Sequence, residues 1–204
     1  MLLNYYMKIV SFLIMFCVAI SLNAQHVSDY YSNKKEIIGN GYFYNVDKDK
    51  YSDHLIVQSK NNVKSNLPWY YKGTTEYADI RWAKYAIPLD KMIIYDLFKE
   101  VFTEEEITGM KNEELDYYKK RFPKMDIPLV LHFNIRTVVA LTGEVEEVIF
   151  SFKAIPPYTN IHPDKLYLLE NKIKERMSFT ILDILKDRFS YIKAEAFEIN
   201  IDNL

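Results

Sequence analysis

The clearest alternation of hydrophobic and polar positions lies in residues 127–152. Every second position of its first half is apolar: Ile127, Leu129, Leu131, Phe133 and Ile135. This spacing is typical of a β-strand that buries one face. A turn follows at 141–144, where Gly143 can adopt a positive φ, and apolar residues alternate again over 148–152. The segment therefore predicts an antiparallel β-hairpin.

Two amphipathic helices are predicted from apolar residues spaced three and four positions apart. The first is expected to open at Pro88 and to end near Phe102, and its stripe is Leu89, Ile93, Leu97 and Val101. The second follows His162, with Pro163 in its first turn and Asp164 at the positive end of its dipole. Its expected buried positions are Leu166, Leu169, Ile173 and Met177. We expect this second helix to cover the hairpin.

A further pair of helices is predicted between these two. Thr103 and Glu106 have the spacing of a capping box, in which each residue caps the other at a helix N-terminus. Asn112 is expected to cap a separate helix that Pro123 ends.

Strands are predicted at both ends of the chain beyond its first residues. Short strands with turns at 39–41 and 47–50 are expected over 25–66, and Phe197, Ile199 and Ile201 alternate as a final strand. No strong pattern marks 178–190.

Together these elements predict one α+β domain over residues 25–204, built on an antiparallel sheet. We divide it into a β-rich extension at 25–87, a helical segment at 88–123 and a strand-strand-helix-strand core at 124–204.

The first 24 residues have the form of a signal peptide. Residues 9–20 are an apolar run that follows Lys8 and precedes a small residue at Ala24, after which we expect cleavage. The run is shorter than the roughly 20 apolar residues that a membrane-spanning helix needs. We therefore expect an exported protein, periplasmic or secreted, that does not span the membrane after cleavage. Both Met1 and Met7 are possible starts.

The charge and the cysteine content argue against a nucleic-acid-binding protein, a lipoprotein and a disulfide-stabilised protein. Loss of Lys8 would leave 25 basic and 28 acidic residues, a net charge of −3, and the longest basic run is 119–121. A nucleic-acid partner is not expected. Cys17 lies inside the apolar run rather than at the cleavage point, so a lipid anchor is not expected, and the mature chain would have no disulfide.

The densest aromatic cluster is the main candidate ligand site: Trp69, Tyr70, Tyr71, Trp82 and Tyr85. Aromatic faces can stack on sugar rings or anchor a protein interface. The same residue types also favour strands and cores, so a structural role is the alternative.

Catalytic and metal-binding motifs are not found. The histidines are not spaced to hold a metal from one element, and we expect no cofactor. His132 shares a strand face with Asn134 and Arg136, and this face is either an ordinary half-exposed strand face with polar residues or a small polar groove. Glu114 is expected to be a solvated helix carboxylate whose replacement by alanine leaves the fold intact. We expect no enzymatic activity, with an unrecognised hydrolase as the remaining enzymatic alternative.

Residues 133–179 resemble small secreted proteins of unknown function from Bacteroides-type bacteria. Those proteins have a Gly-Tyr strand, as at 41–42, and a hairpin of the form T-G-x-V-x-E-V-x-F-S-F, as at 142–152. The P-Y-x-x-I segment at 157–161 also matches. Over 127–202 the order of elements looks like the C-terminal domain of the TonB energy-transducing protein. That resemblance implies a periplasmic module that pairs by strand addition, with no catalytic residue.

Two functions follow as hypotheses. The first is a cell-envelope interaction module whose final strand offers a docking edge at Phe197, Ile199, Asn200 and Ile201. The alternative for that strand is an internal position that only completes the core. The second hypothesis is a glycan-binding module that uses the Trp69 to Tyr85 cluster.

Overall fold

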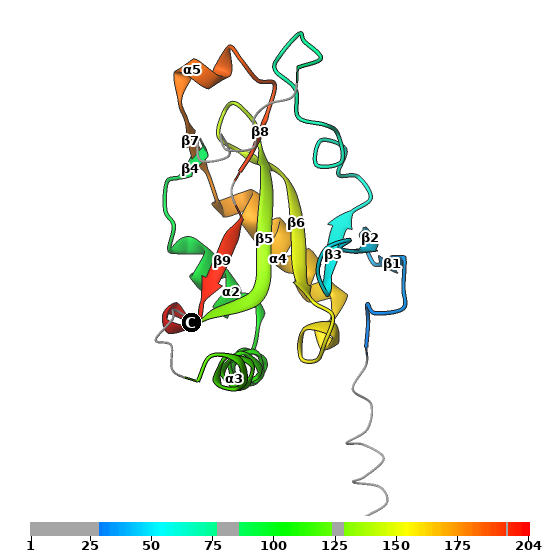
Figure 1. The fold of residues 1–204 in the computed structure, drawn as a ribbon. Helices are drawn as coiled ribbons and strands as arrows, with labels where there is room; N and C mark the ends of the chain where they lie inside the picture. Colours follow the sequence, from blue (N-terminus) through cyan, green and yellow to red (C-terminus); the bar gives the residue numbers. More distant parts are fainter. Residues whose placement is uncertain (1–28, 77–85, 124–128, 195) are drawn as a thin grey trace, which may run out of the picture.

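The computed structural model describes residues 29–76, 86–123, 129–194 and 196–204. Its central sheet, as far as the described residues show, has the strand order β1-β2-β3-β6-β5-β8, with β9 beside β5. All its strand pairs are antiparallel. The strands are β1 (Glu36–Gly39), β2 (Tyr42–Lys48), β3 (His54–Ser59), β5 (Val130–Val139), β6 (Val145–Lys153), β8 (Ile192–Lys193) and β9 (Phe197–Asn200). The helix at 163–176 lies behind this sheet in the view of Figure 1, and the combination of helices with an antiparallel sheet confirms the predicted α+β class.

The predicted hairpin is β5 and β6, joined by a turn in which Gly143 has a φ of 98°. Phe133, Phe150 and Phe152 are fully buried, as their alternation indicated. Helix α4 (Pro163–Arg176) packs behind them (Figure 1). A short 3-10 helix, η2 (Tyr158–Asn160), links β6 to α4.

Helix α2 (Ile93–Val101) begins five residues later than the sequence indicated. Pro88 instead ends strand β4 (Ala86–Pro88), which pairs with β7 (Phe179–Ile181) in a separate two-stranded sheet. Leu89 is 70% exposed, so it is not part of the buried stripe. That stripe consists of Ile94, Leu97, Phe98 and Val101.

Helix α3 (Glu104–Arg121) begins with the predicted capping box of Thr103 and Glu106. The expected separate helix after Asn112 is wrong, because α3 continues through this residue to Arg121. An asparagine caps a helix only where the backbone hydrogen bonds are interrupted, and here they are not.

The N-terminal strands belong to the same sheet as the C-terminal hairpin. Gly41, with a φ of 90°, turns the chain between β1 and β2, and β3 then pairs with β6 from His54↔Lys153 to Gln58↔Ile149. The β-rich extension is thus continuous with the core.

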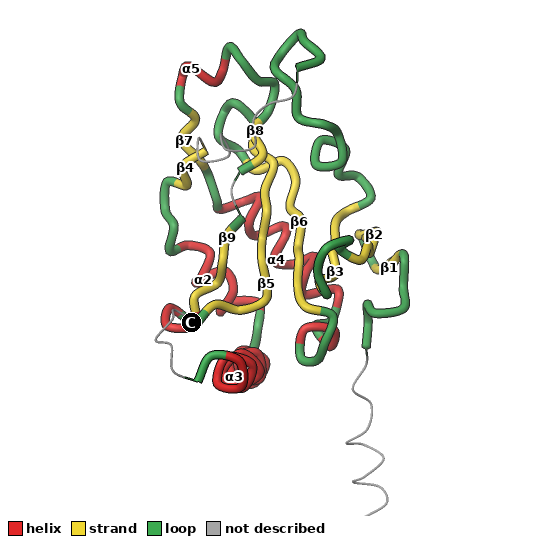
Figure 2. Tube along the Cα trace, in the orientation of Figure 1, coloured by secondary structure: helices red, strands yellow, loops and turns green. Residues whose placement is uncertain are grey.

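The C-terminal segment has more elements than the sequence indicated. Strand β7 and the short helix α5 (Asp183–Lys186) come before β8, and the final strand β9 ends at Asn200. Ile201 opens a 3-10 helix, η3 (Ile201–Asn203), rather than continuing the strand as expected. Figure 2 shows β9 running beside the lower part of β5. In the described ranges, we find no helix both long and apolar enough for a membrane span.

Candidate functional site

Strand β9 forms part of an edge of the main sheet. On its inner side it pairs with β5, and the N–H of Ile201 then donates to the carbonyl of Leu129 at 2.9 Å. In the described part of the chain no strand pairs with its outer side. The N–H of Asn200 points outward and donates to the Tyr95 hydroxyl at 3.4 Å. Because hydrogen-bonding groups alternate in direction along a strand, those of Glu198 also point outward.

A cavity of about 400 Å³ lies along this outer edge. Strand β4, the start of α2, Phe179 and residues 196–198 line it. Ile87 and Met92 are 47% and 52% exposed, and the Phe197 ring lies 6.1 Å from that of Phe179. The cavity therefore offers an apolar surface directly beside the outward-facing backbone groups of β9.

The charged side chains that line this cavity do not favour a ligand of either sign. Lys91 and Glu198 are the charged residues of its lining, and they carry opposite charges. An uncharged or apolar side chain suits it better than an ion, because a lone charge would lose hydration there.

The four residues expected at the docking edge have different positions. Ile199 is fully buried and Ile201 is 8% exposed, so neither side chain can reach a partner. Asn200 caps η3, with its side-chain oxygen accepting from the N–H of Asp202 at 2.8 Å. Phe197 lines the cavity. The sequence did not indicate the outward backbone groups of Glu198, because their direction depends on which strand pairs with β9.

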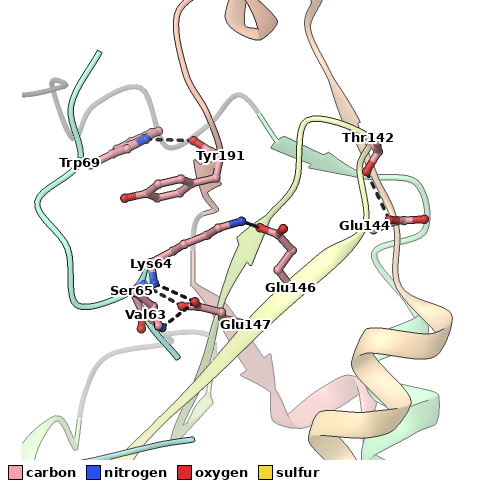
Figure 3. Close-up of polar contacts among 9 residues, drawn as sticks. All are labelled: Val63, Lys64, Ser65, Trp69, Thr142, Glu144, Glu146, Glu147 and Tyr191. Atoms are coloured by element: carbon pink, nitrogen blue, oxygen red, sulfur yellow. Dashed lines mark hydrogen bonds and ion pairs between the residues drawn. The ribbon is translucent and has the colours of Figure 1, made fainter. Parts of the chain in front are cut away.

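The aromatic cluster expected to bind a ligand packs into the protein where it is described. Trp69 is only 8% exposed, and its ring lies 4.9 Å from that of Phe189. Its indole N–H donates to the carbonyl of Tyr191 at 3.1 Å, as Figure 3 shows. Tyr71 stacks on the same Phe189 at 5.1 Å. Both rings thus have the structural role that was the alternative.

The remaining members of that cluster are Tyr70, Trp82 and Tyr85. Tyr70 is 36% exposed. Trp82 and Tyr85 lie outside the described residues.

A second cluster centres on Glu114, which the sequence analysis placed in solvent. That expectation is wrong, because Glu114 is fully buried on α3. Its carboxylate accepts from the Tyr158 hydroxyl, from the His132 N–H at 2.9 Å and from the His132 ring. Burial alone raises the pKa of Glu114, but the hydrogen bonds from His132 and Tyr158 outweigh it and lower the pKa overall.

The His132 ring is oriented by this buried carboxylate. Its Nδ1 is the donor, since an ionised carboxylate only accepts. Tyr117 lies edge-on to His132 at 5.0 Å, and His54 lies 5.8 Å away. Burial, together with His132, lowers the pKa of His54.

This histidine cluster has the parts of an acid–base pair but lacks a visible nucleophile. Within the described ranges no serine or threonine hydroxyl hydrogen-bonds to His132. The described residues also contain no group of three histidine, cysteine or acidic side chains that could hold a metal.

Comparison with known proteins shows which fold this chain shares and does not show a function. No family model matches the chain, and no curated protein matches it. The fold is similar to that of a DUF5043 family protein from Bacteroides uniformis, with a TM-score of 0.62. That match covers 85% of this chain and 88% of the other, at 22% identity. It is consistent with the resemblance to uncharacterised Bacteroides-type proteins and shows a shared fold alone.

Proposed function

We propose that this protein is an exported, non-enzymatic interaction module of the bacterial cell envelope, which docks a partner strand on the outer edge of β9. The observation that carries the proposal is the outer side of β9, where no strand of the described residues pairs, directly beside the 400 Å³ cavity. Export itself rests on the apolar run at 9–20 and the small residue at Ala24.

Strand addition needs two components, and both are present at this edge. Backbone N–H and C=O groups provide affinity, and a pocket for alternate side chains provides specificity. The backbone N–H and C=O of Glu198, which point outward because directions alternate along β9, provide the groups for affinity. The cavity wall at Ile87, Met92 and Phe197 provides the second. The partner is therefore an extended segment with an apolar side chain.

The absence of enzymatic activity is part of the proposal. The carboxylate of Glu114 is buried, and its donors are groups of the protein itself. A carboxylate held in this way joins α3, β5 and η2. This structural role explains its burial without any substrate.

Glycan binding at the Trp69 to Tyr85 cluster is the less supported alternative. A ring that stacks on a sugar needs an open face, and Trp69 and Tyr71 both pack against Phe189.

Proline at position 200 tests strand docking. Asn200 has a φ of −72°, which proline adopts, and its N–H lies outside the ladder with β5. This N–H donates to Tyr95 in the free protein, and a partner strand on the outer side of β9 would have to accept from it instead. Asn200→Pro should therefore stay folded, with an unchanged far-UV spectrum, and lose partners that the parent protein captures from an envelope extract. Met92→Asp should weaken the same capture, because it places a charge in the cavity wall.

The matched control is Ile199→Pro. The N–H of Ile199 points toward β5, so this variant should lose stability rather than only binding. A folded Asn200→Pro protein that captures the same partners as the parent would show that β9 is not the docking edge.

A further inference from the structure

A cavity of about 880 Å³ lies away from β9. It opens between the β2 strand, the loop at 59–67, the start of β6 and the middle of α4, with Tyr191 at its end. Its volume is within the range of about 300 to 1,000 Å³ that is common for small-molecule sites.

One wall of this cavity is a loop fixed by a buried carboxylate. Glu147, 7% exposed, accepts from the backbone N–H groups of Val63, Lys64 and Ser65, at 2.8, 2.7 and 2.7 Å. Figure 3 shows these three bonds converging on one side chain. Lys193 holds the far side of the loop by donating to the carbonyls of Ser65 and Leu67, both at 2.8 Å. The wall is therefore built before any ligand arrives.

Every charged group of the lining has a partner within the walls. Lys64 pairs with Glu146, as Figure 3 shows. Lys174 pairs with Glu170 at 2.6 Å, and Glu170 also accepts from Tyr44 at 2.6 Å. The remaining charged residue, Glu147, is bound by the loop. A charged ligand would have to break these pairs or remain unpaired, and both are costly.

Two side-chain amides face this cavity without a partner among the described residues. Asn61, in the loop at 59–67, and Asn171, on α4, are exposed, line the cavity, and make no side-chain hydrogen bond with the described residues. An amide offers both donors and an acceptor, which matches a hydroxyl group, itself donor and acceptor.

Half-buried aromatic rings complete the lining. Tyr167 lies 5.2 Å from Tyr42, so the two rings form one continuous surface on α4 and β2. Tyr191 also lines the cavity, with the Lys64 ammonium 5.7 Å from its ring centre. Such rings can pack on the C–H faces of a ligand whose edges carry polar groups.

We propose that this cavity binds a neutral oligosaccharide. The paired charges disfavour an ionic ligand, the free amides match hydroxyl groups, and the tyrosine rings match sugar C–H faces. This site is separate from the docking edge at β9 and from the aromatic cluster at Trp69.

Binding to an array of neutral and acidic glycans, followed by titration calorimetry on the strongest neutral oligosaccharide, tests the proposal. Asn61→Ala and Asn171→Ala should each weaken binding by roughly tenfold, the effect of losing one or two hydrogen bonds to the ligand. Both residues are exposed, so their melting temperatures should stay close to that of the parent.

The matched control is Asn112→Ala, an exposed asparagine on helix α3 outside the cavity. It should bind as the parent does. Asn200→Pro should also keep its glycan affinity, which separates this site from strand docking. The proposal is overturned by an array without a neutral ligand, by acidic glycans that bind best, or by cavity variants that match Asn112→Ala.

Discussion

A carboxylate shielded from water, as in Glu114, keeps its charge only while its hydrogen-bond donors stay in place. The donors here come from β5 and η2, which meet α3 only in the folded protein. Removing the carboxylate leaves the buried Tyr158 hydroxyl without its acceptor. The backbone N–H of His132 then has only the Tyr158 hydroxyl oxygen to donate to, at 3.2 Å.

Glu114→Ala should therefore lower the free energy of unfolding by about 3 kcal/mol or more. Asp116→Ala, which removes an exposed carboxylate from the same helix, should change it by less than about 0.5 kcal/mol. Urea unfolding of both variants measures the difference. Equal midpoints would mean that the buried network does not stabilise the fold.

The same residue predicts a pH dependence. The pKa of Glu114 lies below its ordinary value of 4.5 in the folded protein. Its contribution to stability is therefore present above pH 4.5 and is lost as the pH falls through the folded pKa. Glu114→Gln should be less stable than the parent at neutral pH, and the gap in melting temperature should narrow in acid. A gap that stays constant with pH would contradict this assignment.

The burial of Glu114 could have been suspected from the sequence. Ile107, Met110 and Glu114 are spaced three and four residues apart, so the carboxylate continues an apolar stripe. Its partners could not be inferred, because His132 and Tyr158 reach it from distant parts of the chain.

At the scale of the element, the sequence predicted best those strands and helices whose periodicity, turn or cap lies within their own segment. The hairpin of β5 and β6 and helix α4 each carry their own periodicity, turn or cap. The start of α2 was misplaced because Pro88 pairs with β7, a contact across about 90 residues that no local pattern records. The edge position of β9 depends in the same way on distant pairing.

The two faces of the β5–β6 hairpin give a direct test. Phe150→Asp and Leu131→Asp place a charge in the core and should unfold the protein, since both side chains are buried. Arg136→Asp, on the exposed face of β5, should keep the fold. Circular dichroism distinguishes these outcomes. Equal melting temperatures for all three variants would contradict the assignment of the buried and exposed faces.

The turn at Gly143 gives a second test at this scale. A Cβ there would lie 2.1 Å from the carbonyl oxygen of Phe179, in addition to the strain of a φ of 98°. Gly73 has a φ of 74° but open space around it. Gly143→Ala should therefore destabilise the protein by about 2 kcal/mol or more, and Gly73→Ala by less. The difference between the melting temperatures of the two variants measures the cost of the close contact with Phe179, because both variants carry the strain of a positive φ.

At the scale of the whole molecule, the expected export makes a mass prediction. If the signal is cleaved after Ala24, the exported form begins at Gln25 and carries no lipid. Intact mass spectrometry of this form tests both points. A mass that includes residues 1–24, or a lipid adduct, would contradict the expected processing.

The pairing of β3 with β6 also governs the order in which the molecule can fold. These strands are about 90 residues apart, so β3 has an open edge until residue 153 has left the ribosome. The hairpin of β5 and β6 closes over a short loop and can form first, whereas its union with β3 must overcome a much larger loop-closure entropy. Leu55 and Val57 remain exposed during this interval. A chaperone that covers these side chains would therefore protect the N-terminal strands of the nascent chain until β6 has formed.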